Sequence, residues 1–201
     1  MKRTYLSIIC ACCIMALAAQ DSFKVNYKGD KPNIIDFAWA YLNYLESNQD
    51  ECGDHPENGV RDALDRYCKG LPFDEYRTIT VDKKNGYILY EFKYESTVHR
   101  IEMCYWNEAD GKHKLFAFCN MNTIDYETNQ LIVTETHGMD FYRYNNATHK
   151  MTDCNPPGFN IEYNCAYELP RTGKNITVTK WNANGTKTKR TLKWNGHRFS
   201  F

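Results

Sequence analysis

The sequence predicts an α+β fold in which two N-terminal helices pack on a curved antiparallel β-meander of eight to ten strands. Three observations predict this fold. Apolar residues repeat at helical spacing in residues 32–48 and 56–69, and the period changes to two from Tyr76 onward. Short Asn-Gly and Asp-Gly turns then separate the later segments, which indicates hairpins and therefore antiparallel neighbours. A helix-capped β-sandwich is the alternative arrangement.

Residues 1–19 have the organisation of a secretory signal peptide. Lys2 and Arg3 form a basic head, residues 8–19 form an apolar run, and that run ends in small residues. The run is well short of the roughly 20 residues that a membrane-spanning helix needs. We therefore expect cleavage, no transmembrane helix, and a single secreted, periplasmic or surface domain over residues 20–201.

The second reading of the N-terminus is a lipid anchor. Ile9-Cys10-Ala11-Cys12 fits the aliphatic-x-small-Cys pattern of bacterial lipoproteins. Only residues 5–9 would then serve as the apolar core, which is short, so soluble secretion is the favoured prediction.

The first helix is expected within residues 32–48. Asn33 followed by Asp36 forms a capping pair, and Pro32 lies just outside the start, where it removes no helical hydrogen bond. The residues expected to face the core are Ile34, Ala38, Tyr41, Leu42 and Leu45.

The second helix is expected over residues 56–69. Asp54 with Glu57 forms a capping-box variant, and Gly70 stands past the end. Its expected inner face consists of Val60, Leu64 and Tyr67.

Ten strands are expected after the helices. Their ranges are 76–82, 86–95, 98–106, 113–121, 130–136, 139–145, 148–154, 161–168, 174–181 and 187–194. The long irregular segment 155–160 is expected to cross a sheet edge or to cover the mouth of a cavity.

Agreement between sheet faces predicts the register of two hairpins. A three-residue loop with a left-handed Gly185 pairs Ile176 with Leu192, and the apolar faces then agree. The same rule applied to residues 109–111 pairs Met103 with Ala117, Tyr105 with Leu115 and Ile101 with Cys119. That register places Cys104 and Cys119 on opposite faces.

Charge and cysteine content limit the classes of partner and cofactor. Loss of Lys2 and Arg3 leaves 23 basic against 25 acidic residues, so no nucleic-acid partner is expected. Six cysteines remain after residue 19 and allow three disulfides of open connectivity. They are Cys52, Cys68, Cys104, Cys119, Cys154 and Cys165. No Cys-x-x-Cys follows residue 19, so no metal and no cofactor is predicted.

No motif in the sequence names a reaction. The chain has no Gly-x-Ser-x-Gly, and the pair His149 and Cys154 is the nearest approach to a thiol nucleophile beside a base. Several glutamates alternate with apolar residues, as on the solvent face of a strand, and they are Glu91, Glu95, Glu102 and Glu135. We therefore predict no catalytic residue.

Aromatic side chains near polar turns are the predicted ligand-binding residues. Each of the three tryptophans chosen ends a predicted strand, and the two tyrosines share one strand face; the five are Trp106, Tyr142, Tyr144, Trp181 and Trp194. Rings beside Asn and Asp combine apolar area with hydrogen bonds, which suits a sugar or a protein partner.

The C-terminal half resembles a group of known exported proteins. The segments GMDFYRYNNATHKM at 138–151 and LPRTGKNITVTKWNANGTKTKRTLKWNG at 169–196 are similar to small exported proteins of gut Bacteroidetes. The resemblance implies an extracytoplasmic bacterial setting and provides no catalytic residue.

These observations favour a noncatalytic binding or inhibitory module that recognises a protein or a glycan. The alternative is a small extracytoplasmic hydrolase with its site in the mouth of the curved sheet. The sequence leaves the oligomeric state open.

Overall fold

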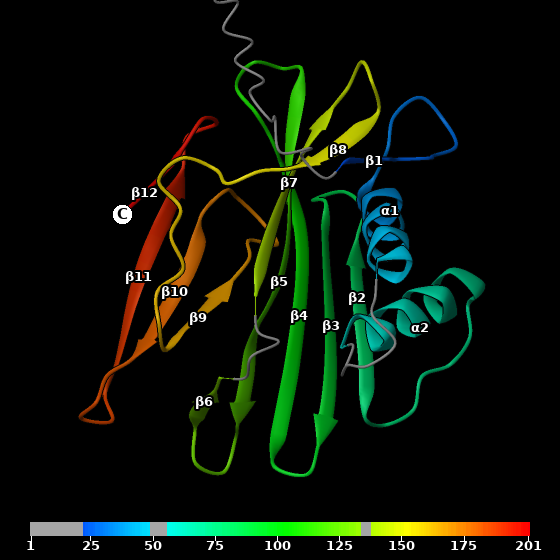
Figure 1. Cartoon of the computed structure of the whole chain (residues 1–201). Helices are drawn as coiled ribbons and strands as arrows, with labels where there is room; N and C mark the ends of the chain where they lie inside the picture. The colour runs from blue at the N-terminus through cyan, green and yellow to red at the C-terminus, as the bar shows by residue number, and fades with distance from the viewer. Residues whose placement is uncertain (1–21, 49–55, 134–137) are drawn as a thin grey trace, which may run out of the picture.

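The chain folds into an α+β arrangement of helices, a large antiparallel sheet and a second, smaller sheet. The computed structural model describes residues 22–48, 56–133 and 138–201. Two helices lie against one face of the large sheet, and the small sheet lies on its other side (Figure 1). The predicted signal peptide, Cys52, Asp54 of the predicted capping box and the part of the expected 130–136 strand after residue 133 lie outside the described residues.

Helix α1 (Ile34–Ser47) begins at the predicted cap. The Asn33 side chain accepts a hydrogen bond from the Ile35 backbone N–H at 2.9 Å, and Asp36 accepts one from the Asn33 N–H at 2.8 Å. These bonds satisfy two backbone N–H groups at the start of the helix, which have no carbonyl group of a preceding helical turn to bond with. Its buried residues are Ile34, Phe37, Ala38, Tyr41 and Leu42.

Helix α2 (Pro56–Lys69) has the predicted bounds but a narrower buried face. Val60 and Leu64 are fully buried, whereas Tyr67 is 37% exposed, so its expected place on the inner face is wrong. A Cβ on Gly59 would lie 2.8 Å from the Tyr90 hydroxyl. The absence of a side chain at Gly59 therefore lets α2 approach the sheet, which explains a residue that otherwise weakens a helix.

The large sheet has eight strands in the order β1-β8-β7-β5-β4-β3-β2, with β6 paired to β5. All of the pairings are antiparallel. Its strands are β1 (Ser22–Lys24), β2 (Arg77–Asp82), β3 (Tyr87–Tyr94), β4 (Thr97–Asn107), β5 (His113–Asp125), β6 (Gln130–Ile132), β7 (Met139–Asn145) and β8 (Lys150–Asp153).

The small sheet has four strands in the order β12-β11-β10-β9. They are β9 (Cys165–Glu168), β10 (Ile176–Trp181), β11 (Lys187–Trp194) and β12 (Phe199–Ser200). The sequence pattern missed β1 and β12, because strands of three and two residues show no measurable alternation. The segment expected as a strand from residue 161 is one only over Cys165–Glu168.

The two predicted hairpin registers have different outcomes. Ile176 pairs with Leu192 and Gly185 is left-handed at φ 79°, so the first prediction is confirmed. The second is wrong by one residue, because Met103 pairs with Phe118. Asp110 Oδ1 accepts the backbone N–H groups of Lys112 and His113, which lengthens the turn by one residue.

This register also corrects the placement of two cysteines. Cys104 lies opposite Ala117, and Cys104 and Cys119 share the face that packs against the small sheet. Both are fully buried. Neither forms a disulfide, and the other described cysteines, exposed Cys68, half-buried Cys154 and buried Cys165, are also free thiols.

A bulge in β5 changes which way its side chains point. Arg100 pairs with Asn122 and Glu102 pairs with Cys119, so Ile101 lies opposite two residues instead of one. Past the bulge, the Asn122 side chain reaches the small sheet and Thr123 contacts His99.

Two hydrophobic cores hold the layers together. The first fills the space between the helices and the large sheet around residues such as Phe37, Leu64 and Phe116. The second fills the space between the sheets around residues such as Phe141 and Tyr167. The large sheet is therefore apolar on both faces over much of its length.

Candidate functional site

The five aromatic residues predicted to bind a ligand all lie in the protein interior. Tyr142 and Tyr144 are 7% and 1% exposed in the helix-side core, and Trp106 and Trp194 are 4% and 5% exposed between the sheets. Trp181 is 9% exposed. Packing uses the apolar area of all five rings, so none of these predicted ligand-binding residues offers an exposed face to a ligand.

Hydrogen bonds fix two of these tryptophans in structural positions. Trp106 Nε1 donates to the Lys174 carbonyl at 3.0 Å, and Trp181 Nε1 donates to the Asn129 carbonyl at 3.1 Å. Both bonds tie a strand of one sheet to a segment outside that strand. Their role in the described structure is to join elements.

An open groove of about 550 Å³ lies on the helix side of the large sheet. We call it the aromatic groove. Its lining residues are Gly59, Asp74, Tyr76, Arg77, Tyr90, Phe92, His99, Ile101 and Asn120. Its volume is within the ~300–1,000 Å³ of typical small-ligand sites.

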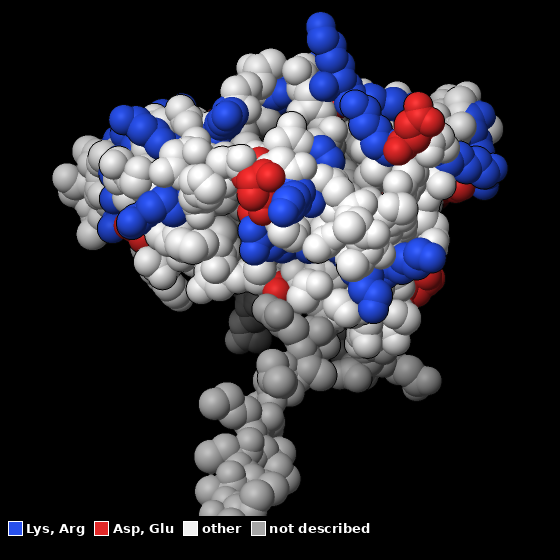
Figure 2. Space-filling view, turned by 90° about the horizontal axis from the view of Figure 1, so that it is seen from above, with Lys and Arg blue, Asp and Glu red and all other residues white. Residues whose placement is uncertain are grey.

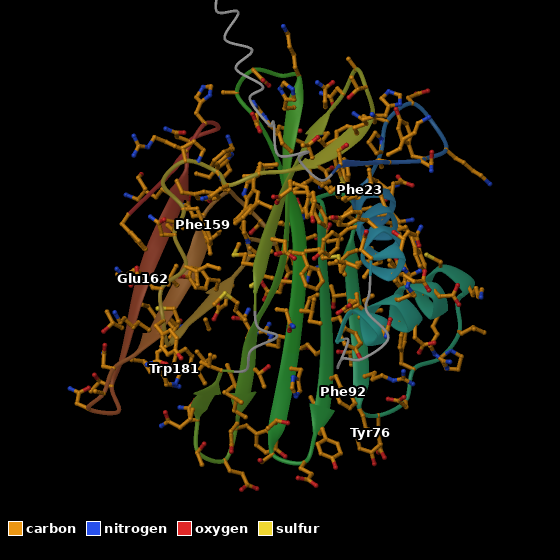
Figure 3. The ribbon with its side chains drawn as sticks, in the orientation of Figure 1. Phe23, Tyr76, Phe92, Phe159, Glu162 and Trp181 are labelled. Carbon is orange, nitrogen blue, oxygen red and sulfur yellow. The ribbon has the colours of Figure 1, made fainter. Side chains whose placement is uncertain are left out.

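The groove forms because neighbouring strands carry these side chains on the same sheet face. Arg77 pairs with Phe92, and Phe92 in turn pairs with His99 across β2, β3 and β4. Tyr90 pairs with Ile101 one step further along the same face. Figure 3 shows Tyr76 and Phe92 together below the helices, where the sheet face is left open.

Aromatic rings form the accessible walls of the groove. Tyr76 is 55% exposed, and Phe92 lies beside His99 with ring centroids 6.2 Å apart. Phe92 also stacks on Tyr94, which is 59% exposed, with centroids 6.4 Å apart and planes 21° from parallel. Phe92 itself is half-buried, so Tyr94 is the ring of this stack that offers an exposed apolar face to a ligand.

An ion pair forms the polar rim. Asp74 Oδ1 accepts the backbone N–H groups of Tyr76 and Arg77, and Oδ2 accepts from Arg77 Nε at 2.7 Å. Arg77 also binds Asp62 of α2 at 2.8 Å. The hydrogen bond from Arg77 lowers the pKa of Asp74, so this carboxylate is ionised at neutral pH.

The floor of the groove carries a half-buried histidine and a buried asparagine. His99 Nδ1 lies 3.1 Å from Thr123 Oγ1, which fixes the orientation of the imidazole. Asn120 is 5% exposed beside Ile101, which is 2% exposed. An amide and an oriented imidazole under aromatic walls can hydrogen-bond a ligand that stacks above them.

Sequence reasoning missed the groove because it chose aromatics next to turns. The sequence of β3 contained a usable signal. This strand carries four aromatic residues, Tyr87, Tyr90, Phe92 and Tyr94, which are more than a single core face needs. Three of these share a face, to which strand pairing brings His99. The hydrogen bond from the Lys93 N–H to the Tyr76 carbonyl places Tyr76 beside them.

A second cavity of about 340 Å³ lies at the edge of the large sheet, and we call it the edge cavity. Asp140 and Asp153 line it, together with Asn155, Phe159 and Asn160 of the segment 155–160, predicted to cross a sheet edge or to cover the mouth of a cavity. Buried Tyr41 donates to Asp140 Oδ2 at 2.5 Å. Part of Asp140 stays exposed, but loss of solvent around its carboxyl group raises its pKa.

Glu102 is a buried acid between the two sheets. It is 1% exposed and accepts a hydrogen bond from the Leu169 backbone N–H. Burial raises its pKa to about 7. Its expected place on the solvent face is wrong. Apolar residues occupy both odd and even positions of 101–106, and this pattern is the sequence signal for a strand that is covered on both faces.

Glu108, Asp110 and His113 bring ligand-type atoms within 4.8 Å of one another. These atoms already have partners, because His113 Nδ1 lies 2.5 Å from Asp110 and Arg143 Nε donates to Glu108 at 2.8 Å. The hydrogen bond with His113 lowers the pKa of Asp110 to about 2. The cluster is therefore an internally satisfied turn.

His149 and Cys154 do not form a nucleophile pair in the described structure. His149 Nε2 lies 3.4 Å from the Tyr27 hydroxyl, while Cys154 lines the edge cavity. Burial raises the pKa of Cys154 to about 12, so its thiol is protonated at neutral pH.

Comparisons with known proteins give no relative from which a function could be transferred. No family model matches this chain, and no curated protein or solved structure matches it significantly. Within the described residues, the helices are too short or too polar to cross a bilayer.

Proposed function

We propose that this protein is a secreted, noncatalytic binding module that recognises a glycan through the aromatic groove. The observation that carries the proposal is the combination of the exposed Tyr76 ring and the half-buried Phe92 ring with a polar floor in one open cavity of about 550 Å³. Sugar rings present apolar faces and outward hydroxyl groups, and this surface complements both.

The carboxylate content of the groove favours binding over hydrolysis. Among its described lining residues, Asp74 is the one carboxylate, and Arg77 keeps it ionised. Glycosidases use two carboxyl groups, one of which must be protonated to act as the general acid. The groove therefore has hydrogen-bond partners for a sugar but lacks that pair.

A protein partner fits the groove less well than a short glycan. Stable protein interfaces bury about 800 Å² on each partner, usually over a flat surface. The groove is concave, and its polar groups lie on the floor beneath the rings. A chain of sugar rings could enter it with little adjustment of the backbone.

Glycan-array screening followed by calorimetry tests this proposal. We expect a glycan ligand, and we expect Tyr76→Ala and Phe92→Ala each to weaken its binding at least tenfold, which is about 1.4 kcal/mol. Tyr163→Ala is the matched control, because Tyr163 is 81% exposed and lies outside the groove. Binding that all three variants leave unchanged would overturn the assignment of the groove.

The edge cavity supports hydrolysis as a second candidate function. Asp140 and Asp153 line the same cavity, and Asp140 has the raised pKa of a proton donor. Release of reducing sugar from the array ligand by the wild type, and its loss in Asp140→Asn, would favour the enzyme. Binding without turnover, with the Asp140→Asn variant still binding, would favour the module.

A further inference from the structure

The charges of this chain are distributed unevenly. The chain has 25 basic and 25 acidic residues, but residues 171–201 contain eight of the basic residues and no Asp or Glu. The zero net charge therefore conceals a strongly basic C-terminal segment. This segment forms β10, β11 and β12, which are three of the four strands of the small sheet.

One face of the small sheet carries exposed lysines. In β11, Leu192 and Trp194 are 2% and 5% exposed in the core between the sheets. Because side chains alternate along a strand, the intervening residues point away from that core. We call these exposed residues the lysine face, and they are Lys187, Lys189, Thr191 and Lys193.

Hydroxyl groups accompany the lysines on this face. Thr191 pairs with Thr177 of β10, and Lys193 pairs with Ser200 of β12. Glu168 of β9 lies opposite Thr177 and is the acid that strand pairing brings to this face. The exposed part of this face lies along β11, because Thr179, which pairs with Lys189, is 4% exposed, and Trp181, which pairs with Lys187, is 9% exposed.

The charges of the lysine face are largely uncompensated. Elsewhere in the basic segment, Lys180 and Arg190 pair with Glu162. By contrast, Lys189 and Lys193 have no carboxylate within 4.0 Å among residues 22–48, 56–133 and 138–201. Figure 2 shows blue side chains at the left of the molecule, the side on which Figure 1 places β11 and β12.

We propose that the lysine face binds a polyanionic polysaccharide, a glycan with sulfate or carboxylate groups repeated along its chain. Lys187 and Lys189 are about 7 Å apart along the strand, and Lys189 and Lys193 are about 13 Å apart. Such a row matches repeated charges better than a single small anion. The threonine and serine hydroxyls between the lysines suit the hydroxyl groups of the sugars.

Single-stranded nucleic acid fits this face less well. Its binding relies on bases that stack on exposed aromatic rings. The Trp181 ring is 9% exposed, and Lys187 Nζ lies 4.7 Å from its centroid. The face therefore offers charge and hydroxyl groups without a free ring.

Heparin binding by the purified protein, measured at several salt concentrations, tests the proposal. We expect Lys189→Gln/Lys193→Gln to weaken binding at least tenfold and to reduce the salt slope by up to about two, one for each lysine. The matched control is Lys83→Gln/Lys84→Gln, which removes the same charge from the exposed β2–β3 turn and should change binding little. Thermal unfolding verifies that both variants remain folded.

Three outcomes would overturn the proposal: no heparin binding at low salt, equal losses in the two double variants, or tighter binding of a single-stranded oligonucleotide than of heparin. The test is independent of the aromatic groove. Tyr76→Ala should leave heparin binding unchanged, so failure of one proposal does not imply failure of the other.

Discussion

The side-chain amide of Asn122 pairs with the backbone of Tyr167 as a neighbouring strand would. Asn122 Nδ2 donates to the Tyr167 carbonyl at 2.8 Å, and the Tyr167 N–H donates to Asn122 Oδ1 at 2.9 Å. Asn122 is 2% exposed and Tyr167 is 1% exposed. One side chain of the large sheet therefore satisfies both polar backbone groups of a buried residue at the edge of the small sheet.

Replacement of Asn122 should weaken the contact between the sheets. Asn122→Leu keeps a similar volume but leaves a buried donor and a buried acceptor of Tyr167 without the amide that pairs with them. We expect a loss of about 2–4 kcal/mol in the free energy of unfolding, measured by urea denaturation. Exposed Asn26→Ala should cost less than about 0.5 kcal/mol. An Asn122→Leu variant as stable as the control would show that this pairing contributes little.

Glu102 should make stability depend on pH near neutrality. Its pKa in the folded protein is about 7, above the ordinary value of 4.5, because burial disfavours the charged form. Between these values the folded state holds more protons than the unfolded state, so the free energy of unfolding should fall as pH rises from about 5 to about 8. The predicted loss is on the order of 3 kcal/mol.

The Glu102→Gln variant isolates this effect. Its amide oxygen can still accept the Leu169 N–H, but the side chain does not titrate. Urea denaturation at about pH 5 and about pH 8 should show a smaller pH dependence for Glu102→Gln than for the wild type or for the exposed control Glu95→Gln. Parallel pH profiles for the wild type and Glu102→Gln would contradict the raised pKa.

Gly158 should be intolerant of any side chain. Its φ is 78°, and a Cβ there would lie 2.1 Å from the Phe199 carbonyl oxygen. That oxygen belongs to the backbone of a fully buried residue and has little room to move. Gly158→Ala should therefore destabilise the protein by more than about 2 kcal/mol.

Gly173→Ala is the control for Gly158→Ala. Gly173 has a similar φ of 83°, but a Cβ added there would meet no described atom within 4 Å apart from its own chain neighbours. This variant should cost only the left-handed strain of about 1 kcal/mol. Similar melting temperatures for the two variants would show that the chain near Phe199 adapts to the extra carbon.

The cysteines should differ in their reaction with iodoacetamide. Cys68 is exposed, whereas Cys104 and Cys119 are fully buried, and burial raises the pKa of both buried thiols. Mass spectrometry of the native protein should find rapid labelling at Cys68 and labelling of the buried pair only after unfolding. A disulfide-linked peptide that contains Cys104 would contradict the free thiols.

The sequence determined the local elements because their signals lie within short segments. The Asn33–Asp36 cap fixes the start of α1, and the left-handed Gly185 fixes the register of the β10–β11 hairpin. Sequence reasoning failed by one residue at the turn around Asp110, where side-chain hydrogen bonds lengthened the loop. Very short strands such as β12 gave no pattern to detect.

The tertiary structure alone decided which faces became the two cores and which remained open. Alternation shows that two side chains share a face, but it does not show what covers that face. Trp106 and Tyr144 are therefore buried, although their aromatic surface suits a ligand equally well, while Tyr76 remains accessible. Long-range packing of the helices and of the small sheet makes that difference, because burial depends on residues distant in the chain.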